Sequence, residues 1–173
     1  MKLIIVGAGG FGREVFSLIK NINQVKPTFH VLGFADDALE VGTPVQDRTV
    51  LCSIADLEHT KAEAVVVAIG NSQVREAVAN KIPAHFNKPN IIHPLAVFQD
   101  AERITIGKGC IICAGNIFTT DVAIGNFCIV NLSCTIGHDA VLEDFTSIMP
   151  GVNLSGGAHL KRGAYVGTGA KLI

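Results

Sequence analysis

The sequence predicts two domains of different architecture: a small α/β domain over residues 1–90 and a parallel β-helix over residues 91–173. The first 90 residues alternate short apolar runs with helix-like segments, which is typical of a parallel sheet covered by helices on both faces. From residue 106 onward, apolar residues recur every six positions. A helix requires a period near 3.6 and a flat strand a period of 2, so a period of six indicates a solenoid of short strands and corners.

The six-residue repeat defines the interior of this solenoid. Large apolar residues hold the first place of every hexad, and mostly small residues hold the place four residues later. Both places are expected to face inward, with glycines at the corners. Three hexads complete a triangular coil, so residues eighteen apart are expected to stack. The large interior residues are Ile106, Ile112, Phe118, Ile124, Val130, Ile136, Leu142, Ile148, Leu154, Leu160, Val166 and Leu172.

The first 90 residues contain three expected strands, at 3–6, 31–35 and 64–69. The expected helices are residues 13–21 and residues 72–80, and Asn71 or Ser72 is the expected cap of the second one. A short helix is expected at 54–58 and a last extended segment at 88–92.

A glycine motif follows the first strand and opens the first helix. Residues 7–12 read GAGGFG, which matches the pattern G-x-G-x-x-G. Unpaired N–H groups and the positive helix end favour a diphosphate there, and two acidic residues that end the second strand could hold ribose hydroxyls or a base. The pattern predicts a nucleotide site in a Rossmann-like domain. The alternative is a turn that only lets helix and strand pack. The candidate residues are Gly7, Gly9, Gly10, Gly12, Asp36 and Asp37.

Composition excludes several classes of protein. Hydrophobic residues make up 49% and charged residues 17%, which indicates a folded core. Because 14 Lys and Arg balance 15 Asp and Glu without a basic run, no nucleic acid partner is expected. No signal peptide and no membrane span are expected, and five cysteines, an odd number, fit a reduced cytoplasmic chain. Cys110, Cys128 and Cys134 hold small interior places, so packing is favoured over zinc or redox chemistry for Cys110-x-x-Cys113, and no metal is expected.

Polar and apolar residues on the outside of the solenoid suggest two functions. His138 and Asp139 lie together at a corner, where the carboxylate could orient the imidazole as a general base, and Asn131 lies outward one hexad earlier. The alternative is a solvated corner histidine. Apolar rows on the outer walls indicate a partner surface that a parallel trimer would bury. These rows are Ile111, Ile129, Ser147 and Tyr165, and Phe127 with Phe145.

The order of the motifs resembles the bacterial sugar acetyltransferases of the sialic acid O-acetyltransferase and bacillosamine N-acetyltransferase type (NeuD/PglD-like). The resemblance spans essentially the whole chain. It rests on residues 7–12 (GAGGFG), 33–37 (GFADD), 68–71 (AIGN), 92–94 (IHP) and the segment from Asn131 to His138-Asp139.

The resemblance implies a left-handed β-helix, a homotrimer, a nucleotide-sugar bound by the first domain and acetyl-CoA bound between neighbouring solenoids. It implies that His138 is the general base, supported by Asp139, that Asn131 and the Phe11 region contact the acceptor, and that Gly70 and Asn71 join the nucleotide site. The implied acetyl-CoA residues are Gly156, whose N–H would meet the thioester carbonyl, and Gly167 and Thr168.

The chain departs from the family pattern in two places. Many members have histidine where this chain has Phe11, so a polar contact from that side chain to the sugar is lost. Members usually continue past the position of Ile173 with further coils and a tail that completes the acetyl-CoA site. We therefore expect either further chain or a neighbouring subunit to cover the last strand edge.

The sequence thus predicts an acetyl-CoA-dependent acetyltransferase that acts on the amino or hydroxyl group of a nucleotide-linked or sialic-acid-like sugar, in bacterial surface-polysaccharide biosynthesis. One alternative is a non-catalytic nucleotide-binding module that its solenoid trimerises. A second is an NAD-dependent oxidoreductase, for which a packed solenoid is a poor substrate domain. Sequence leaves open the acceptor sugar, N- against O-acetylation and the base of the nucleotide.

Overall fold

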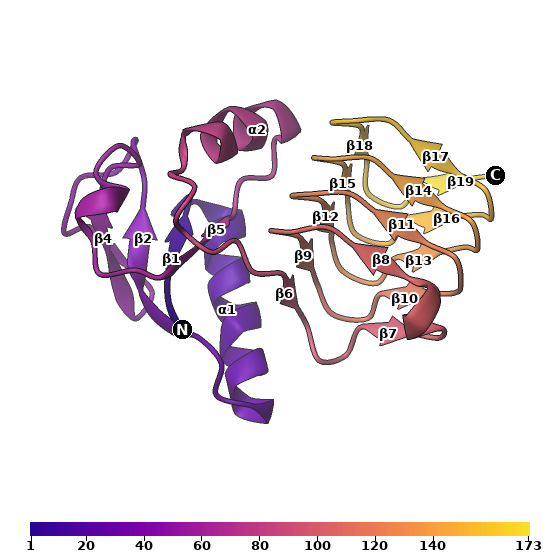
Figure 1. Ribbon diagram of the computed structural model, residues 1–173, viewed down its shortest axis with the longest axis horizontal. Helices are drawn as coiled ribbons and strands as arrows, with labels where there is room; N and C mark the ends of the chain where they lie inside the picture. The colour runs from indigo at the N-terminus through magenta and orange to yellow at the C-terminus, as the bar shows by residue number, and fades with distance from the viewer.

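The computed structural model describes residues 1–173. Figure 1 shows an α/β unit formed by β1–β5, α1 and α2, and beside it a solenoid formed by β6–β19. The first solenoid strand begins at Ile91, and a domain boundary near residue 90 stays a prediction. None of the helices combines the length and the apolar character needed to cross a membrane.

The sheet of the α/β unit has the order β3-β4-β2-β1-β5. Its longer strands are parallel, but β3 runs antiparallel to β4, so the sheet is not parallel throughout as predicted. Strands β3 and β4 were not predicted, because residues 44–52 contain only a few apolar residues among polar ones. The strands are β1 (Lys2–Val6), β2 (His30–Ala35), β3 (Pro44–Val45), β4 (Arg48–Cys52) and β5 (Ala64–Val67).

Two helices cover opposite faces of this sheet, because alternate strand residues point to opposite sides. Helix α1 (Gly10–Val25) packs in the same apolar cluster as Leu3 and Ile5, and α2 (Ser72–Lys81) packs in the same cluster as Ile4 and Val6. The predicted cap of α2 is confirmed, since the side chain of Asn71 accepts a hydrogen bond from the N–H of Val74. Single 3-10 turns lie at η1 (Leu57–His59), where a helix at 54–58 was predicted, and at η2 (Ala101–Arg103).

The solenoid is a triangular prism with three walls of parallel two-residue strands, which confirms the predicted parallel β-helix. Wall 1 contains β6 (Ile91–Ile92), β9 (Ile111–Ile112), β12 (Ile129–Val130), β15 (Ser147–Ile148) and β18 (Tyr165–Val166). Wall 2 contains β7 (Val97–Phe98), β10 (Ile117–Phe118), β13 (Thr135–Ile136), β16 (Asn153–Leu154) and β19 (Lys171–Leu172). Wall 3 contains β8 (Thr105–Ile106), β11 (Ala123–Ile124), β14 (Val141–Leu142) and β17 (His159–Leu160). We call the edges between them corners 1–2, 2–3 and 3–1, in the order in which the chain passes them.

The register of the walls confirms the eighteen-residue coil. Ile111, Ile129, Ser147 and Tyr165 are successive partners on wall 1. Ile91 pairs with Ile111 at a larger spacing, because the turn η2 inserts two residues into the first coil. The large interior residues form one apolar cluster that also contains Cys110, Cys128 and Cys134, as predicted.

Wall 1 packs directly on the α/β unit, which corrects the prediction of an outer surface there. Ile111 and Ile129 join the cluster beneath α1, and Phe127 and Phe145, at corner 3–1, join the cluster beneath α2. All four side chains are at most 7% exposed within this single chain, whereas Tyr165 is 61% exposed. The rows interpreted as a trimer surface are therefore mostly the contact between the two units of one chain.

Candidate active site

The glycine motif lines a cavity of about 430 Å³ at the end of β1 and β5. Most of the predicted nucleotide-binding residues meet there, although β2, β1 and β5 come from distant parts of the sequence. Those that line the cavity are Gly7, Gly9, Gly10, Phe11, Asp36, Asp37 and Gly70. Asn71 instead caps α2 and lines a neighbouring cavity with Gly70 and Tyr165.

The start of α1 offers unpaired donors to this cavity. Its N-cap residue, Gly9, supplies no side-chain hydrogen bond, and the first turn contains no acidic residue. The first N–H groups of a helix have no partner inside the helix, and the positive helix end adds to their attraction for an anion. These donors fit a phosphate or diphosphate group.

Gly12 has a packing function and does not line the cavity. A Cβ atom at this position would collide with the carbonyl of Gly7, so only glycine lets α1 approach β1 this closely. Gly12 thus allows helix and strand to pack closely, which is the alternative function considered for the motif, while Gly7, Gly9 and Gly10 line the cavity.

The two predicted carboxylates bind backbone N–H groups around the cavity. Asp36 accepts hydrogen bonds from Ala8 at 2.7 Å and from Ala38 at 2.8 Å, and Asp37 accepts one from Ile54 at 2.8 Å. Asp36 thereby fixes the glycine loop to the end of β2. Both side chains line the cavity, where their oxygen atoms could accept hydrogen bonds from ribose hydroxyls.

His138 and Asp139 form a pair at corner 2–3 of the solenoid. Nδ1 of His138 lies 2.8 Å from Oδ2 of Asp139, and both side chains are about two-thirds exposed, at 66% and 67%. The carboxylate favours the tautomer with the proton on Nδ1, which leaves Nε2 as a free acceptor. An accessible Nε2 beside an orienting carboxylate is the arrangement that a general base requires.

The next coil supports this histidine through Gly156. A Cβ atom on Gly156 would collide with the Cε1 and Nε2 atoms of the His138 ring, so the ring rests directly on the glycine backbone. The N–H of Gly157 donates to the carbonyl of His138 at 2.7 Å. The N–H of Gly156 donates to no other group of the chain and lies at the same corner as the imidazole.

Asn131, Gly167 and Thr168 lie at a different edge of the prism, corner 1–2. Strand pairing on wall 1 stacks Asn131 and Gly167 in one column, two coils apart. Asn131 is 7% exposed and accepts a hydrogen bond from the N–H of Leu132, whereas Gly167 and Thr168 are exposed. Within one chain, wall 2 therefore separates these three residues from His138 and Gly156.

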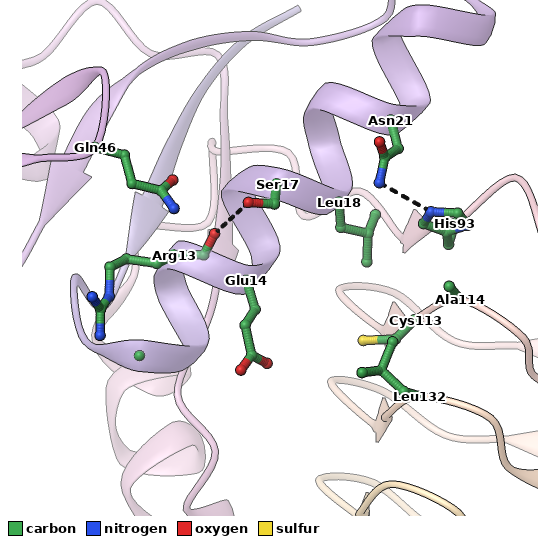
Figure 2. A pocket seen from close by; sticks show the side chains of 11 residues that line it. Arg13, Glu14, Ser17, Leu18, Asn21, Gln46, His93, Cys113, Ala114 and Leu132 are labelled. Carbon is green, nitrogen blue, oxygen red and sulfur yellow. Dashed lines mark hydrogen bonds between the residues drawn. The ribbon is translucent and has the colours of Figure 1, made fainter.

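A second cavity between α1 and corner 1–2 was not predicted. It has a volume of about 470 Å³, and Figure 2 shows Glu14, Leu18 and Asn21 of α1 opposite Cys113 and His93. It adjoins the first cavity at Gly10, which lines both. The polar stripe along α1, at positions 13, 14, 17 and 21, is the sequence signal that could have indicated it.

Two titratable groups of this second cavity are perturbed by burial. The pKa of the Cys113 thiol is raised to about 12, because burial disfavours the thiolate, so this cysteine is neutral and unreactive near pH 7. Burial lowers the pKa of His93, whose Nδ1 accepts a hydrogen bond from the N–H of Leu95. Cys113 faces α1 while Cys110 faces the solenoid interior, so the two do not form a pair.

Comparisons with known proteins agree with this architecture. Residues 2–82 match the family model described as PglD N-terminal domain. GDP-perosamine N-acetyltransferase from Escherichia coli O157:H7 is 32% identical over 169 residues, which cover 96% of this chain and 75% of that protein. The chain belongs to the PglD-like family of sugar acetyltransferases. It is accordingly an acyltransferase, and neither a binding module nor an oxidoreductase finds support.

Two solved structures share the fold over nearly the whole chain. The acetyltransferase domain of PglB from Neisseria gonorrhoeae, in complex with acetyl coenzyme A, is 28% identical with a TM-score of 0.86, over 98% of this chain and 80% of that one. A mutant perosamine N-acetyltransferase from Caulobacter crescentus, in complex with CoA and GDP-perosamine, is 24% identical with a TM-score of 0.88, over 99% of this chain and 79% of that one. The solenoid is the left-handed β-helix of these acetyltransferases.

Proposed function

We propose that this enzyme transfers the acetyl group of acetyl-CoA to the amino group of a nucleotide-linked amino sugar. The observation that carries the proposal is the pairing of two features in one chain. One is a cavity with free helix N–H groups, suited to a diphosphate, and the other is a corner histidine whose Nε2 is free. The relative that is 32% identical bears the name GDP-perosamine N-acetyltransferase, so a GDP-linked 4-amino sugar is the first acceptor to test.

In the proposed mechanism, Nε2 of His138 removes a proton as the amine nitrogen attacks the thioester carbonyl. Asp139 stabilises the imidazolium that forms. The unpaired N–H of Gly156 donates to the oxyanion of the tetrahedral intermediate. When the intermediate collapses, the C–S bond breaks and the imidazolium returns its proton to the departing thiolate, which gives the amide and free CoA.

A homotrimer is part of the proposal, because the implied acceptor and acetyl-CoA residues lie at two different corners of one prism. A second copy would bring corner 1–2, with Asn131, Gly167 and Thr168, to corner 2–3 of its neighbour. Exposed apolar side chains around wall 2 supply a contact surface for such a copy. They are Leu95, Val97, Ile117 and Leu132, at 67%, 48%, 37% and 45% exposure.

This assembly is tested by sedimentation. The double variant Val97→Glu/Ile117→Glu places two charges on wall 2 and should sediment as a monomer, while the wild type sediments as a trimer. Thr105→Glu, at an exposed position of wall 3, is the control and should leave the trimer intact. A monomeric wild type with full activity would rule out the composite site.

The reaction is tested by release of CoA thiol from acetyl-CoA. The assay uses a panel of GDP-linked and UDP-linked 4-amino sugars, with free sialic acid as a hydroxyl acceptor. We expect release with one nucleotide-linked amine and none with sialic acid. Release with sialic acid alone would overturn the choice of an amine acceptor, and no release with any acceptor would overturn the proposed function.

A further inference from the structure

Arg75, in the first turn of α2, is an arginine buried without a carboxylate partner. It is 1% exposed, and no acidic side chain forms an ion pair with it. Burial lowers its pKa to about 10, which leaves the guanidinium charged near neutral pH. A buried charge is retained only where other polar groups compensate it, so the contacts of Arg75 indicate its function.

The partners of Arg75 are oxygen atoms from three separate segments. Nε donates to the carbonyl of Phe127 at 2.8 Å, and Nη2 donates to the carbonyl of Phe145 at 2.7 Å and to Oγ of Ser147 at 2.8 Å. Nη1 donates to the carbonyls of Ile69 at 2.8 Å and Gly70 at 3.0 Å. One planar group thus binds the end of β5 and two successive coils of the solenoid.

The corner carbonyls that Arg75 binds have no other partner. Phe127 and Phe145 hold left-handed backbone conformations, with φ of 53° and 60°, at a place in the coil that Gly109 and Gly163 also occupy. No backbone N–H donates to the carbonyl of either phenylalanine. Their rings stack at 5.3 Å within the apolar cluster beneath α2. A left-handed conformation is unfavourable for phenylalanine. By binding both carbonyls, Arg75 stabilises the corner in this conformation.

The same guanidinium touches the wall of the nucleotide cavity. Ile69 and Gly70 line that cavity opposite the glycine loop. Ser147 of wall 1 adds a direct hydrogen bond to the carbonyl of Gly70 at 3.2 Å. The end of β5 is consequently fixed to the solenoid through Arg75 and Ser147.

We propose that Arg75, with Ser147, is a positioning residue that fixes the nucleotide cavity relative to the solenoid. This fixed position would align the amino group of a bound acceptor with the coil that carries His138 at corner 2–3. The inference rests on the proposed acetyl transfer. Displacement of a bound substrate by about 1 Å can cost on the order of 100-fold in rate. All residues that line the nucleotide cavity belong to the α/β unit, so we expect the affinity for a free nucleotide to be nearly independent of this alignment.

The test compares Arg75→Lys and Ser147→Ala with Arg162→Gln as a matched control. Arg162 also joins the solenoid to α2, through Glu76, but its side chain is 50% exposed. We expect kcat to fall at least 10-fold in Arg75→Lys and about 3-fold in Ser147→Ala. The dissociation constant of the free nucleotide should stay within 2-fold, and Arg162→Gln should retain wild-type kcat. Wild-type kcat in both Arg75→Lys and Ser147→Ala would overturn the proposal, as would an equal loss in Arg162→Gln.

Hydrogen exchange provides a readout that does not depend on catalysis. In Ser147→Ala and Arg75→Lys, amide exchange in residues 68–75 should accelerate at least 10-fold, while walls 2 and 3 remain protected. This outcome would establish the link between the units even if no acceptor supported acetyl transfer. Unchanged exchange in residues 68–75 in both variants would overturn the link itself, whatever the activity.

Discussion

The α/β unit and the solenoid build their sites by opposite means. In the α/β unit, the groups suited to bind a phosphate are backbone N–H groups at the start of α1, and the side chain of Asp36 holds that backbone in place. At corner 2–3 of the solenoid, the backbone is a repeating support, and the proposed chemistry depends on two exposed side chains, His138 and Asp139. We therefore expect ligand binding to respond to changes of backbone shape, and the reaction rate to respond to the loss of one side chain.

The largest expected effect is on the side-chain site. His138→Ala removes the proposed base and should lower kcat about 100-fold to 10,000-fold, with an unchanged melting temperature because the side chain is exposed. His159 is a matched control, since its Nε2 lies 2.8 Å from Glu143 on the same prism. His159→Ala should keep wild-type kcat. Thiol release with purified variants measures both, and equal losses in the two would refute the assignment of the base.

Gly156 tests whether the backbone support positions the base. Gly156→Ala introduces a Cβ atom into the His138 ring and should displace it, which lowers kcat about 100-fold without loss of fold. Ser155→Ala, the neighbouring exposed position, should have no effect. The kcat of each variant measures the effect on the reaction, and its melting temperature shows whether the fold is retained. Wild-type activity in Gly156→Ala would mean that the ring position is not critical.

Gly12 and Gly9 separate packing from binding within the glycine loop. Gly12→Ala collides with the carbonyl of Gly7 and should cost roughly 1–3 kcal/mol of unfolding free energy. A Cβ atom on Gly9 meets nothing within 4 Å, so Gly9→Ala should keep the stability and weaken nucleotide binding at the cavity edge. Urea unfolding and calorimetric titration measure the two effects. The reverse pattern would contradict the separation.

The smallest expected effect concerns charges on the outside of the solenoid. The N–H of Arg162, followed by Lys161 and His159, holds the pKa of Glu143 below its usual range. A lowered folded-state pKa contributes stability that is present above the unfolded pKa of about 4.3 and is lost as the pH falls through the folded value. Glu143→Gln should melt about 1–3 °C below the wild type at pH 7, and the difference should shrink as the pH falls below the unfolded pKa. A difference that stays constant on acidification would exclude this linkage.

The sequence predicts the solenoid better than the α/β unit. Its period of six determines the length of a coil, the residues of the interior and the stacking of residues eighteen apart. Strands β3 and β4 have no comparable pattern and were missed. The packing of Ile111 and Phe127 against the α/β unit was also missed, because an outward apolar row has the same pattern whether another copy or the same chain covers it.

The candidate site was predictable as separate pieces. The spacing of the glycines predicted that their loop opens a helix, and the position of His138 at a corner of the solenoid marked it as a candidate base. Arg75 gave no signal, because a lone arginine in an amphipathic helix is usually exposed, and its partners are carbonyls from distant segments. The functions of Gly12 and Gly156 depend on close approaches that only the three-dimensional structure contains.

Calorimetric binding of the nucleotide-linked amino sugar to His138→Ala tests whether binding and chemistry reside in different units of the chain. If the α/β unit binds the acceptor and corner 2–3 of the solenoid performs the chemistry, the variant should bind the acceptor within about 3-fold of the wild-type dissociation constant while thiol release is lost. Loss of binding together with activity would contradict this division, as would a His138→Ala variant that still turns over at the wild-type rate.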